Sequence, residues 1–563
     1  MTGADRGASL IFRGGPVLAG NQPGPVAQRP QGPVAPGSSG SVPPPDALAV
    51  CGHLILAVGR TQDIMHLAGP RTRVIDLKGR FLMPGFVDAH AHLVAHGASR
   101  LEVNCKYPRV HSIRDIQARI RERAASTAPG QWVRAWGYDQ SRLLEGRHPT
   151  RFDLDAACPD KPVLLTRACG HIAVVNSMAF GLAHVLDDTP DPPGGKLDRD
   201  ERGAPNGVLR EGAWAVLAGL MAPSAGEVAL NIAAGTQDYL RLGITSVHEA
   251  GVNALTLRAY QVHQRGPGPR LRVYAMIDAG DGPFRAAFLA SGLATGFGDD
   301  WLRIGPFKLM VDGSSSGPTA ATRAPYAVDP SDHGILHIGQ EEIDERFLEA
   351  GRAGFQLTAH AVGDRAIEMV LNGIERALAA AGPGTSGRPA SGPPDRHRIE
   401  HCAMTDPALR ARIKASGIVP VLQPVFLHEF GDGYVRNYGP DRAAGMFAAR
   451  SFLRLGVPIA LSTDCPVTFP DPLPGVYTAV TRQTMDGSIV GPGERLTVAQ
   501  ALQAYTMGGA YASGEESRKG SIEPGKLADL VVLSGHPLAA RPEELREMKA
   551  VLTVVGGEVV FEA

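Results

Sequence analysis

The sequence has few cysteines and none in the spacing of a metal knuckle. Its six cysteines are scattered over 563 residues without a Cys-x-x-Cys pair, which argues against a zinc knuckle or a disulfide framework and favours reduced thiols in the cytoplasm. Long apolar runs are lacking as well, since none approaches the roughly 18 residues that a membrane span requires. The N-terminus has no charged start followed by an apolar core. We therefore expect a cytoplasmic protein that makes no contact with a membrane.

The sequence also lacks an excess of charge of either sign. It carries 56 lysines and arginines against 57 aspartates and glutamates, a formal net charge of −1. Such a balance predicts no attraction to nucleic acid. Apolar residues make up 44% and charged residues 20% of the chain, which are ordinary values for a protein with a sizeable core. A small-molecule substrate is then the expected partner.

Short strand signals lie at both ends of the chain. β-Branched runs broken by glycine and proline occur at 47–50, 53–58 and 73–77, and again at 528–533 and 551–561. Because neither group is large enough to be stable alone, we expect residues 1–83 and 514–563 to form one composite β-sandwich domain. Residues 20–45 are rich in Pro, Gly, Gln and Ser, a composition that predicts a disordered insertion.

Strand-like runs alternate with helix-like ones between these ends. They lie at 87–92, 243–248, 271–277, 302–311, 355–360, 398–401, 418–423 and 458–462. Eight strands alternating with helices predict an α/β fold, a closed (β/α)8 TIM barrel over residues 84–513. More chain follows the first strand than one helix needs, so we expect an inserted subdomain at about 100–225 that roofs the barrel mouth.

Polar side chains lie at the C-terminal ends of several of these runs. His90 and His92 are two residues apart and so point to the same face of an extended strand. A bare His-x-His is as often a pair of surface histidines, but later strands end in Lys308, His360, His401 and Asp464. In a TIM barrel such strand ends meet at one mouth. Together they predict a metal site there.

Seven sequence motifs carry a resemblance to a known family. Five contain the polar strand ends: Met83-Pro-Gly-Phe-Val-Asp-Ala-His-Ala-His92, Lys308-Leu-Met-Val-Asp-Gly-Ser314, His360-Ala-Val-Gly-Asp364, Arg398-Ile-Glu-His401 and Ser462-Thr-Asp-Cys-Pro-Val467. Two more are Gly170-His-Ile-Ala-Val-Val-Asn-Ser177 and Gly525-Lys-Leu-Ala-Asp-Leu-Val531. The seven motifs span nearly the whole chain. In their order along it, they resemble those of the amidohydrolase superfamily and, within it, of the YtcJ-like group that includes N-substituted formamide deformylases. The Pro-rich stretch near the N-terminus departs from the family pattern.

The resemblance implies a role for each polar strand end. His90, His92 and Asp464 would hold one divalent metal ion, with zinc as the expected metal. His360 and His401 would hold a second. Neutral imidazole nitrogens and a carboxylate are ligands that suit zinc.

Lys308 determines whether one ion or two is expected. The resemblance implies that it reacts with CO2 to form a carbamate, an anion that bridges two metal ions. If Lys308 is instead an ordinary surface lysine or a clamp for a substrate anion, a single ion is expected. In either case the family implies hydrolysis of a C–N bond, in an amide, N-acyl or N-formyl group, by a metal-activated hydroxide. Asp464 would also be catalytic, as the proton shuttle.

Three further residues are expected to contact the substrate. The resemblance suggests that His171, in the inserted subdomain, orients the substrate carbonyl as a catalytic, oxyanion-type donor; a structural histidine is the alternative. Gln423 and His428 follow the seventh strand and are expected to line the pocket. Glu400 precedes His401 on the same strand and should point to the opposite face, so we do not count it as a ligand.

The sequence leaves the substrate and two other functions open. Phe426, Tyr434, Tyr438 and Phe469 suggest an apolar pocket wall, with core packing as the alternative. The same barrel could serve a metal-dependent isomerase or decarboxylase, because fold and ligands do not fix the reaction. A catalytically inactive scaffold is a third possibility, against which the intact ligand set counts. The resemblance also implies a homodimer.

Overall fold

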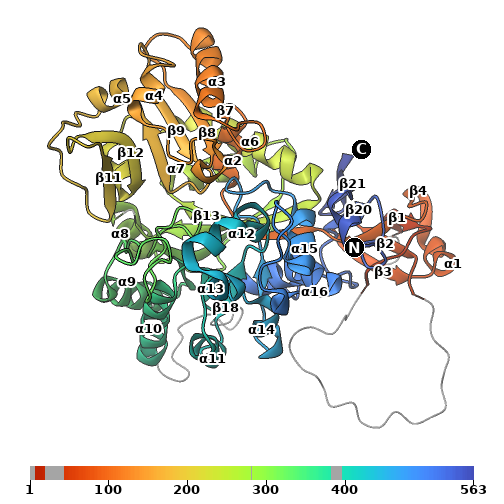
Figure 1. Ribbon diagram of the computed structural model, residues 1–563. Coiled ribbons are helices and arrows are strands. Elements are labelled where there is room, and N and C mark those ends of the chain that lie inside the picture. Colours follow the sequence, from red (N-terminus) through yellow and green to blue (C-terminus); the bar gives the residue numbers. More distant parts are fainter. Residues whose placement is uncertain (1–6, 20–43, 218, 281, 382–395) are drawn as a thin grey trace.

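A nearly closed barrel of eight parallel strands forms the centre of the molecule (Figure 1). The computed structural model describes residues 7–19, 44–217, 219–280, 282–381 and 396–563. In the order in which they pair, the barrel strands are β6 (Phe86–Ala91), β13 (Ile244–Val252), β14 (Arg272–Asp278), β15 (Leu302–Met310), β16 (Leu357–Ala361), β17 (Arg398–His401), β18 (Val419–Leu422) and β19 (Ala460–Leu461). The two ends of the sheet meet where the Asp464 amide donates to the His90 carbonyl at 2.9 Å. The predicted TIM barrel is confirmed.

The barrel strands are buried on both faces, which explains their continuous apolar character. Every residue of β6, β16, β17 and β18 is buried. Helices cover the outside, among them α6 (Ala225–Arg241) and α10 (Asp364–Ala381). The buried residues of α10 recur at three-and-four spacing, so that one helix face packs on the barrel. Among the described residues, no helix combines the length and the apolar character needed to cross a membrane.

The segment between β6 and β13 folds into a sheet of its own. Its strands are β7 (Val103–Asn104), β8 (Val133–Tyr138), β9 (Val163–Arg167), β10 (Ile172–Val175), β11 (Gly195–Arg199) and β12 (Pro205–Glu211), in the order β11-β12-β10-β9-β8-β7. Alternate side chains of β9 enter different hydrophobic clusters, Val163 and Leu165 on one face and Leu164 on the other. α3 (Ile113–Ser126) packs on the first face and α5 (Ser177–Leu182) on the second. We call residues 103–224, which precede α6, the insert.

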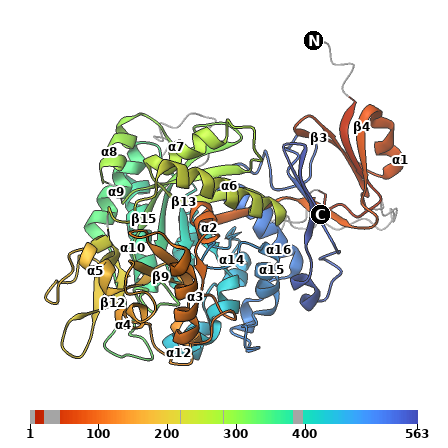
Figure 2. The ribbon, with the colours of Figure 1, turned by 90° about the horizontal axis from the view of Figure 1, so that it is seen from above.

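Two further sheets contain the terminal segments, and Figure 2 shows them side by side, away from the insert. One has the order β3-β2-β1-β4, with β1 (Ala8–Arg13), β2 (Ala47–Cys51), β3 (Leu54–Gly59) and β4 (Ala68–Asp76). The other has the order β22-β21-β20-β5, with β5 (Phe81–Pro84), β20 (Leu530–Leu533), β21 (Ala550–Val555) and β22 (Glu558–Glu562). Leu10, Val50, Leu530 and Val554 belong to one hydrophobic cluster that both sheets share. The predicted disordered insertion at 20–45 lies almost wholly outside the described residues, and the domain boundaries stay predictions.

Candidate metal centre

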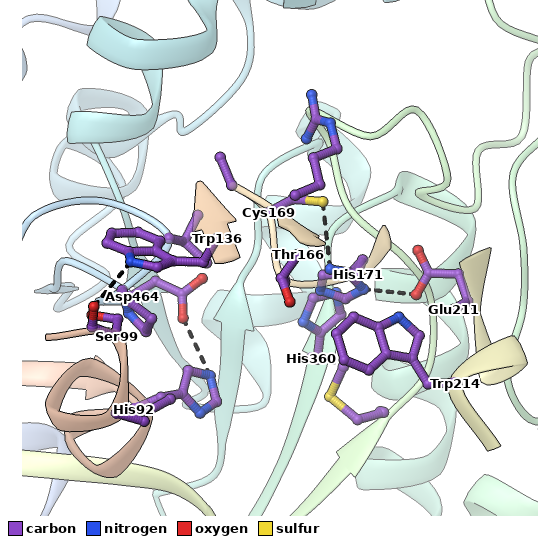
Figure 3. Close-up of a pocket in the computed structure, with 18 of the residues that line it drawn as sticks. His92, Ser99, Trp136, Thr166, Cys169, His171, Glu211, Trp214, His360 and Asp464 are labelled. Carbon is purple, nitrogen blue, oxygen red and sulfur yellow. Dashed lines mark hydrogen bonds and ion pairs between the residues drawn. The ribbon is translucent and has the colours of Figure 1, made fainter. Parts of the chain in front are cut away.

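The polar strand ends meet at one mouth of the barrel. A pocket of about 680 Å³ lies there, between barrel and insert, and its lining includes five predicted metal ligands and His171. The five are His92, Lys308, His360, His401 and Asp464. All but His92 are buried. Figure 3 shows His92 and Asp464 on one side of this pocket and His360 on the other.

His90, the sixth predicted ligand, is oriented by a carboxylate behind it. Its Nδ1 donates to Oε2 of Glu400 at 2.6 Å, and both side chains are fully buried. Such a carboxylate fixes the tautomer and the orientation of a ligating imidazole. Nε2 of His90 is therefore the nitrogen that faces the metal centre.

The position of Glu400 corrects one of our predictions. Arg398 and Glu400 are two residues apart, and both side chains point into the barrel interior. There Nε and Nη2 of Arg398 donate to Oε1 and Oε2 of Glu400 at 2.8 and 2.9 Å. His401 would face outward in a regular strand, but its φ is 69° and that of Cys402 is 43°. This left-handed backbone ends the strand and turns His401 into the mouth. Strand alternation therefore predicts the wrong face for Glu400, because it does not account for the left-handed backbone at His401.

The other three imidazoles are each oriented by one hydrogen bond. Nδ1 of His92 donates to a backbone carbonyl of β13 at 3.1 Å, and Nδ1 of His401 to Oε1 of Gln423 at 2.9 Å. His360 is turned the other way, because its Nε2 donates to the Gly313 carbonyl at 3.1 Å. The nitrogens left for a metal ion are Nε2 of His92, Nε2 of His401 and Nδ1 of His360.

Asp464 carries a buried acceptor that no hydrogen bond from the described residues satisfies. Its Oδ1 lies 3.4 Å from Nε2 of His90 and 3.4 Å from Nε2 of His92. Ligand atoms of His90, His401 and Asp464 all lie within 4.8 Å of one another. A buried carboxylate oxygen among imidazole nitrogens requires a cation to compensate its charge. The residues present therefore fit a divalent metal ion.

The protonation states suit metal binding. Burial lowers the pKa of His90, His360 and His401 well below the usual value for histidine, so each imidazole is neutral at pH 7 and can offer a lone pair. Burial by itself would raise the pKa of Asp464, but the neighbouring histidines outweigh it and the pKa is lowered. The set therefore combines neutral imidazoles with a carboxylate.

Lys308 reaches the same point from β15. Its side chain is buried, and Nζ lies 3.3 Å from Nε2 of His90. Burial lowers the pKa of the Lys308 amine, so the amine loses its proton more readily than an exposed lysine does. A surface position, one of the two alternatives for this lysine, is therefore wrong.

His171 enters the pocket from the insert, at the turn between β9 and β10. Its Nδ1 lies 2.7 Å from Oε2 of Glu211, and its ring centroid lies 5.1 Å from that of His360 (Figure 3). Burial opposes protonation of His171, but the Glu211 carboxylate outweighs it and raises the pKa of His171 to about 9. A cationic donor thus stands beside a predicted metal ligand.

The two other predicted substrate contacts lie away from the pocket. Of the described residues that line it, neither Gln423 nor His428 is one. Gln423 is fully buried and hydrogen-bonds His401, while Nδ1 of His428 lies 3.1 Å from the Gln483 carbonyl. Gln423 therefore orients a predicted metal ligand. The geometry gives no support to a substrate contact for either residue.

The pocket wall differs from the one that the sequence suggested. Phe426, Tyr434 and Tyr438 are buried in the barrel core, and Phe469 is 60% exposed. Trp136 and Trp214, both from the insert, line the pocket instead, together with Glu211 and His337. None of these four is predicted from the sequence, because three lie in the insert, whose strand register the spacing does not define, and His337 lies in a loop after β15. The turn motif beginning at Gly170 was the one signal that the insert reaches the site.

The fold and the site together define a metal-dependent hydrolase. Histidines, a buried lysine and an aspartate surround a pocket at the C-terminal ends of barrel strands, the place where TIM barrels carry their chemistry. A sequence profile described as the amidohydrolase family matches residues 73–561. The chain therefore belongs to the amidohydrolase family, as its motifs predicted.

Individual relatives agree with this assignment. YtcJ of Bacillus subtilis (strain 168), named as an amidohydrolase, is 30% identical over 512 residues, which cover 88% of this chain and 91% of YtcJ. The N-substituted formamide deformylase of Arthrobacter pascens is 30% identical over 532 residues, which cover 92% of this chain and 95% of that protein. Among solved structures, an uncharacterized metal-dependent hydrolase from Pyrococcus furiosus matches with a TM-score of 0.69 and 28% identity, covering 94% of this chain and 99% of that one.

Proposed function

We propose that the protein hydrolyses the C–N bond of an N-acyl or N-formyl amine at a zinc centre. One observation carries the proposal: the buried Asp464 Oδ1 lies 3.4 Å from the Nε2 atoms of both His90 and His92. Hydrogen bonds already engage the opposite nitrogens of these rings. A cation among the three atoms would satisfy a carboxylate and two lone pairs at once.

The remaining ligands would come from later strands. His360 and His401 would hold a second ion through Nδ1 and Nε2, the nitrogens that their hydrogen bonds leave unused. The buried Lys308 would join the two sites as a carbamate: Nζ in its deprotonated form would add to the carbon of CO2 and release a proton, which leaves an anion. When bound, divalent ions polarise a carbonyl and lower the pKa of water from about 16 to near 7.

The chain's own residues would guide the protons. Asp464, ionised and buried at the mouth, would accept the proton of the attacking water and return it to the leaving nitrogen. His171 would donate from Nε2 to the carbonyl oxygen, on which negative charge develops. Its Nδ1 is already engaged by Glu211, so that only Nε2 is available to the substrate.

The substrate class rests on a relative and on the pocket. The similar Arthrobacter pascens protein is named for N-substituted formamides. The pocket of about 680 Å³ leaves room for a substituent larger than a formyl group, and Trp136 and Trp214 supply apolar surface for it. N-formyl and N-acyl amines with apolar substituents are therefore the substrates to screen, by release of formate, carboxylate or amine.

The Asp464→Asn variant tests the proton shuttle. We expect kcat to fall by about 10²- to 10⁴-fold, the usual share of a general acid–base group, while most of the metal stays bound because the four histidines are unchanged. Metal analysis and kinetics on the best substrate of the screen check both. Asp486→Asn, which alters an ion pair with Arg142 at the surface, is the control. Near-normal turnover, or complete loss of metal, would contradict the role given to Asp464.

We also propose that the two terminal sheets form one composite β-sandwich domain. Their side chains share a hydrophobic cluster, and β5, which precedes the barrel, pairs with β20, which follows it. Neither sheet could bury that cluster alone.

A further inference from the structure

Glu211 stands at the junction of insert and barrel with its carboxylate fully engaged. It ends β12 and is 5% exposed. Oε2 accepts from Nδ1 of His171 at 2.7 Å and from Nε2 of His337 at 3.1 Å. Oε1 accepts from Oγ1 of Thr319 at 2.5 Å. His171 belongs to the insert, whereas His337 and Thr319 follow barrel strand β15.

This carboxylate is placed to orient other groups rather than to meet a substrate. Three donors occupy its two oxygens, so it has little capacity left for a metal ion or a reacting proton. A carboxylate that accepts from one nitrogen of an imidazole fixes which nitrogen faces away from it. For His171 that nitrogen is Nε2, and Figure 3 shows the ring between Glu211 and His360.

Glu211 also packs against the residue that orients His360. A Cβ added to Gly313 would lie 2.5 Å from Oε1 of Glu211 and would overlap Thr319 as well. The carbonyl of the same Gly313 accepts from Nε2 of His360 at 3.1 Å. Glu211 can approach this turn closely only because residue 313 is glycine. The carboxylate therefore contacts both His171 and the turn that orients His360.

We propose that Glu211 is a positioning residue that holds His171 of the insert as a substrate-orienting donor, with its carboxylate anchored to His337 of the barrel. This inference rests on the proposed function, in which Nε2 of His171 meets the substrate carbonyl. Both histidines line the pocket, and one shared acceptor fixes both rings. The effect of Glu211 on turnover is exerted through His171.

Three variants test this coupling. Loss of the donor itself, in His171→Ala, should lower kcat by about 10²- to 10³-fold. Glu211→Leu, which removes the acceptor at similar size, should lower kcat about 10- to 100-fold with a smaller change in KM. The double variant should be no slower than His171→Ala within about threefold, because residues that act as a unit are not additive. Losses that multiply instead would show that Glu211 acts independently, and would overturn the proposal.

Two further variants test whether the loss of activity comes from misfolding or from a disturbed hairpin instead of from the missing acceptor. Glu211→Gln keeps an acceptor for His171 and should lose less activity than the Leu variant; it replaces that variant in the cycle should Leu prevent folding. Asp198→Asn breaks the ion pair of 2.6 Å with Arg210 on the same hairpin, outside the pocket lining. We expect this control to keep its activity. A loss equal to that of Glu211→Leu would assign the effect to the hairpin and overturn the proposal.

A readout that needs no substrate separates this inference from the proposed function. Crystal structures of the zinc-loaded wild type and Glu211→Leu should show the His171 ring fixed in the first and rotated or without clear density in the second. An unchanged His171 ring in the variant would overturn the positioning role. If the wild type hydrolyses no N-acyl or N-formyl amine, the proposed function fails, while the two structures still decide the role of Glu211.

Discussion

Glu400 determines which nitrogen of His90 is offered to a metal ion. Its carboxylate accepts hydrogen bonds from Nδ1 of His90 at 2.6 Å, from two nitrogens of Arg398 and from the hydroxyl of Thr358 at 2.6 Å. Because all of these groups are buried, this network compensates the charges of Glu400 and Arg398 and engages the donors that face them. The orientation of His90 is thus set by residues outside the predicted ligand set.

The Glu400→Gln variant should bind metal more weakly. The amide removes the charge that stabilises the donor His90 and leaves Arg398 partly uncompensated, so we expect metal affinity to fall by about 10- to 100-fold. Competition with a chelator of known affinity measures it. Glu375→Gln is the control, since Glu375 pairs with Arg412 on the outer helices. Equal affinities of wild type and Glu400→Gln would contradict the account of His90.

The sequence predicts residues at this scale where spacing along one strand is enough. His90 and His92 share a face by alternation, and Lys308, His360, His401 and Asp464 stand at strand ends, which a barrel must bring together. Glu400 was misplaced because a positive φ at His401 leaves no trace in the spacing. Glu211 and His337 could not be predicted, because their partnership joins two segments 126 residues apart.

At the scale of elements, Arg167 of β9 connects the insert to the barrel by hydrogen bonds. Its guanidinium is almost fully buried, pairs with Asp139 at 3.0 Å and donates to Ser316 at 3.0 Å in the turn after β15. Ser316 belongs to the barrel, so this contact helps to hold the roof over the pocket. This charged anchor within an apolar strand cannot be predicted from the sequence pattern, because its partners come from segments distant along the chain.

Arg167→Met should loosen the insert. The change leaves the Asp139 carboxylate buried without its partner, which costs about 3–5 kcal/mol. Thermal unfolding should start at a markedly lower temperature than in the wild type. Arg147→Met, which breaks the half-exposed pair with Asp153 in the same insert, should cost about 1 kcal/mol or less. Equal unfolding temperatures for the two variants would contradict the anchoring role.

Helix α15 (Pro472–Thr481) begins at a carboxylate in an unfavourable setting. Asp471 caps it by accepting from the Leu473 amide at 3.0 Å, yet burial raises the pKa of Asp471 from 3.8 to about 6. The folded state therefore binds the proton more tightly than the unfolded chain. Stability is highest below pH 4 for this group and is lost as pH rises through about 6.

Asp471→Asn should stabilise the protein at neutral pH. Asparagine caps helices as well as aspartate does and carries no charge, so we expect a gain of about 1–2 kcal/mol at pH 7 for this partly buried group. The gain should shrink towards zero as pH falls from 6 to 4. Unfolding temperatures of both proteins across this range measure it. A difference that does not change with pH would show that ionisation of Asp471 is not its cause.

The strand pattern illustrates what elements can be predicted. Each of the eight predicted barrel strands overlaps an observed one, because parallel strands buried on both faces give continuous apolar runs. β19 keeps only Ala460 and Leu461 of the predicted 458–462. The order of strands in the insert sheet is not predicted from the sequence, because the strands are short and pair in both parallel and antiparallel fashion.

At the scale of the whole molecule, the pocket belongs to two parts of the chain. The predicted metal ligands come from the barrel, whereas His171, Glu211, Trp136 and Trp214 come from the insert. The terminal sheets lie away from the insert (Figure 2) and are tied to the barrel by the buried pair of Arg272 and Asp529 at 2.6 Å. Variation in substrate choice should therefore map to the insert. The homodimer that the family resemblance implies stays a prediction.

Metal content per chain tests the central claim most directly. The measurement is elemental analysis of protein purified without chelator and again after reconstitution with zinc, together with the intact mass in buffer with and without added CO2. We predict about two ions per chain, with a mass increment, or a CO2-dependent rise in retained metal, that reports the carbamate on Lys308. Protein that retains no metal even after reconstitution would contradict the account.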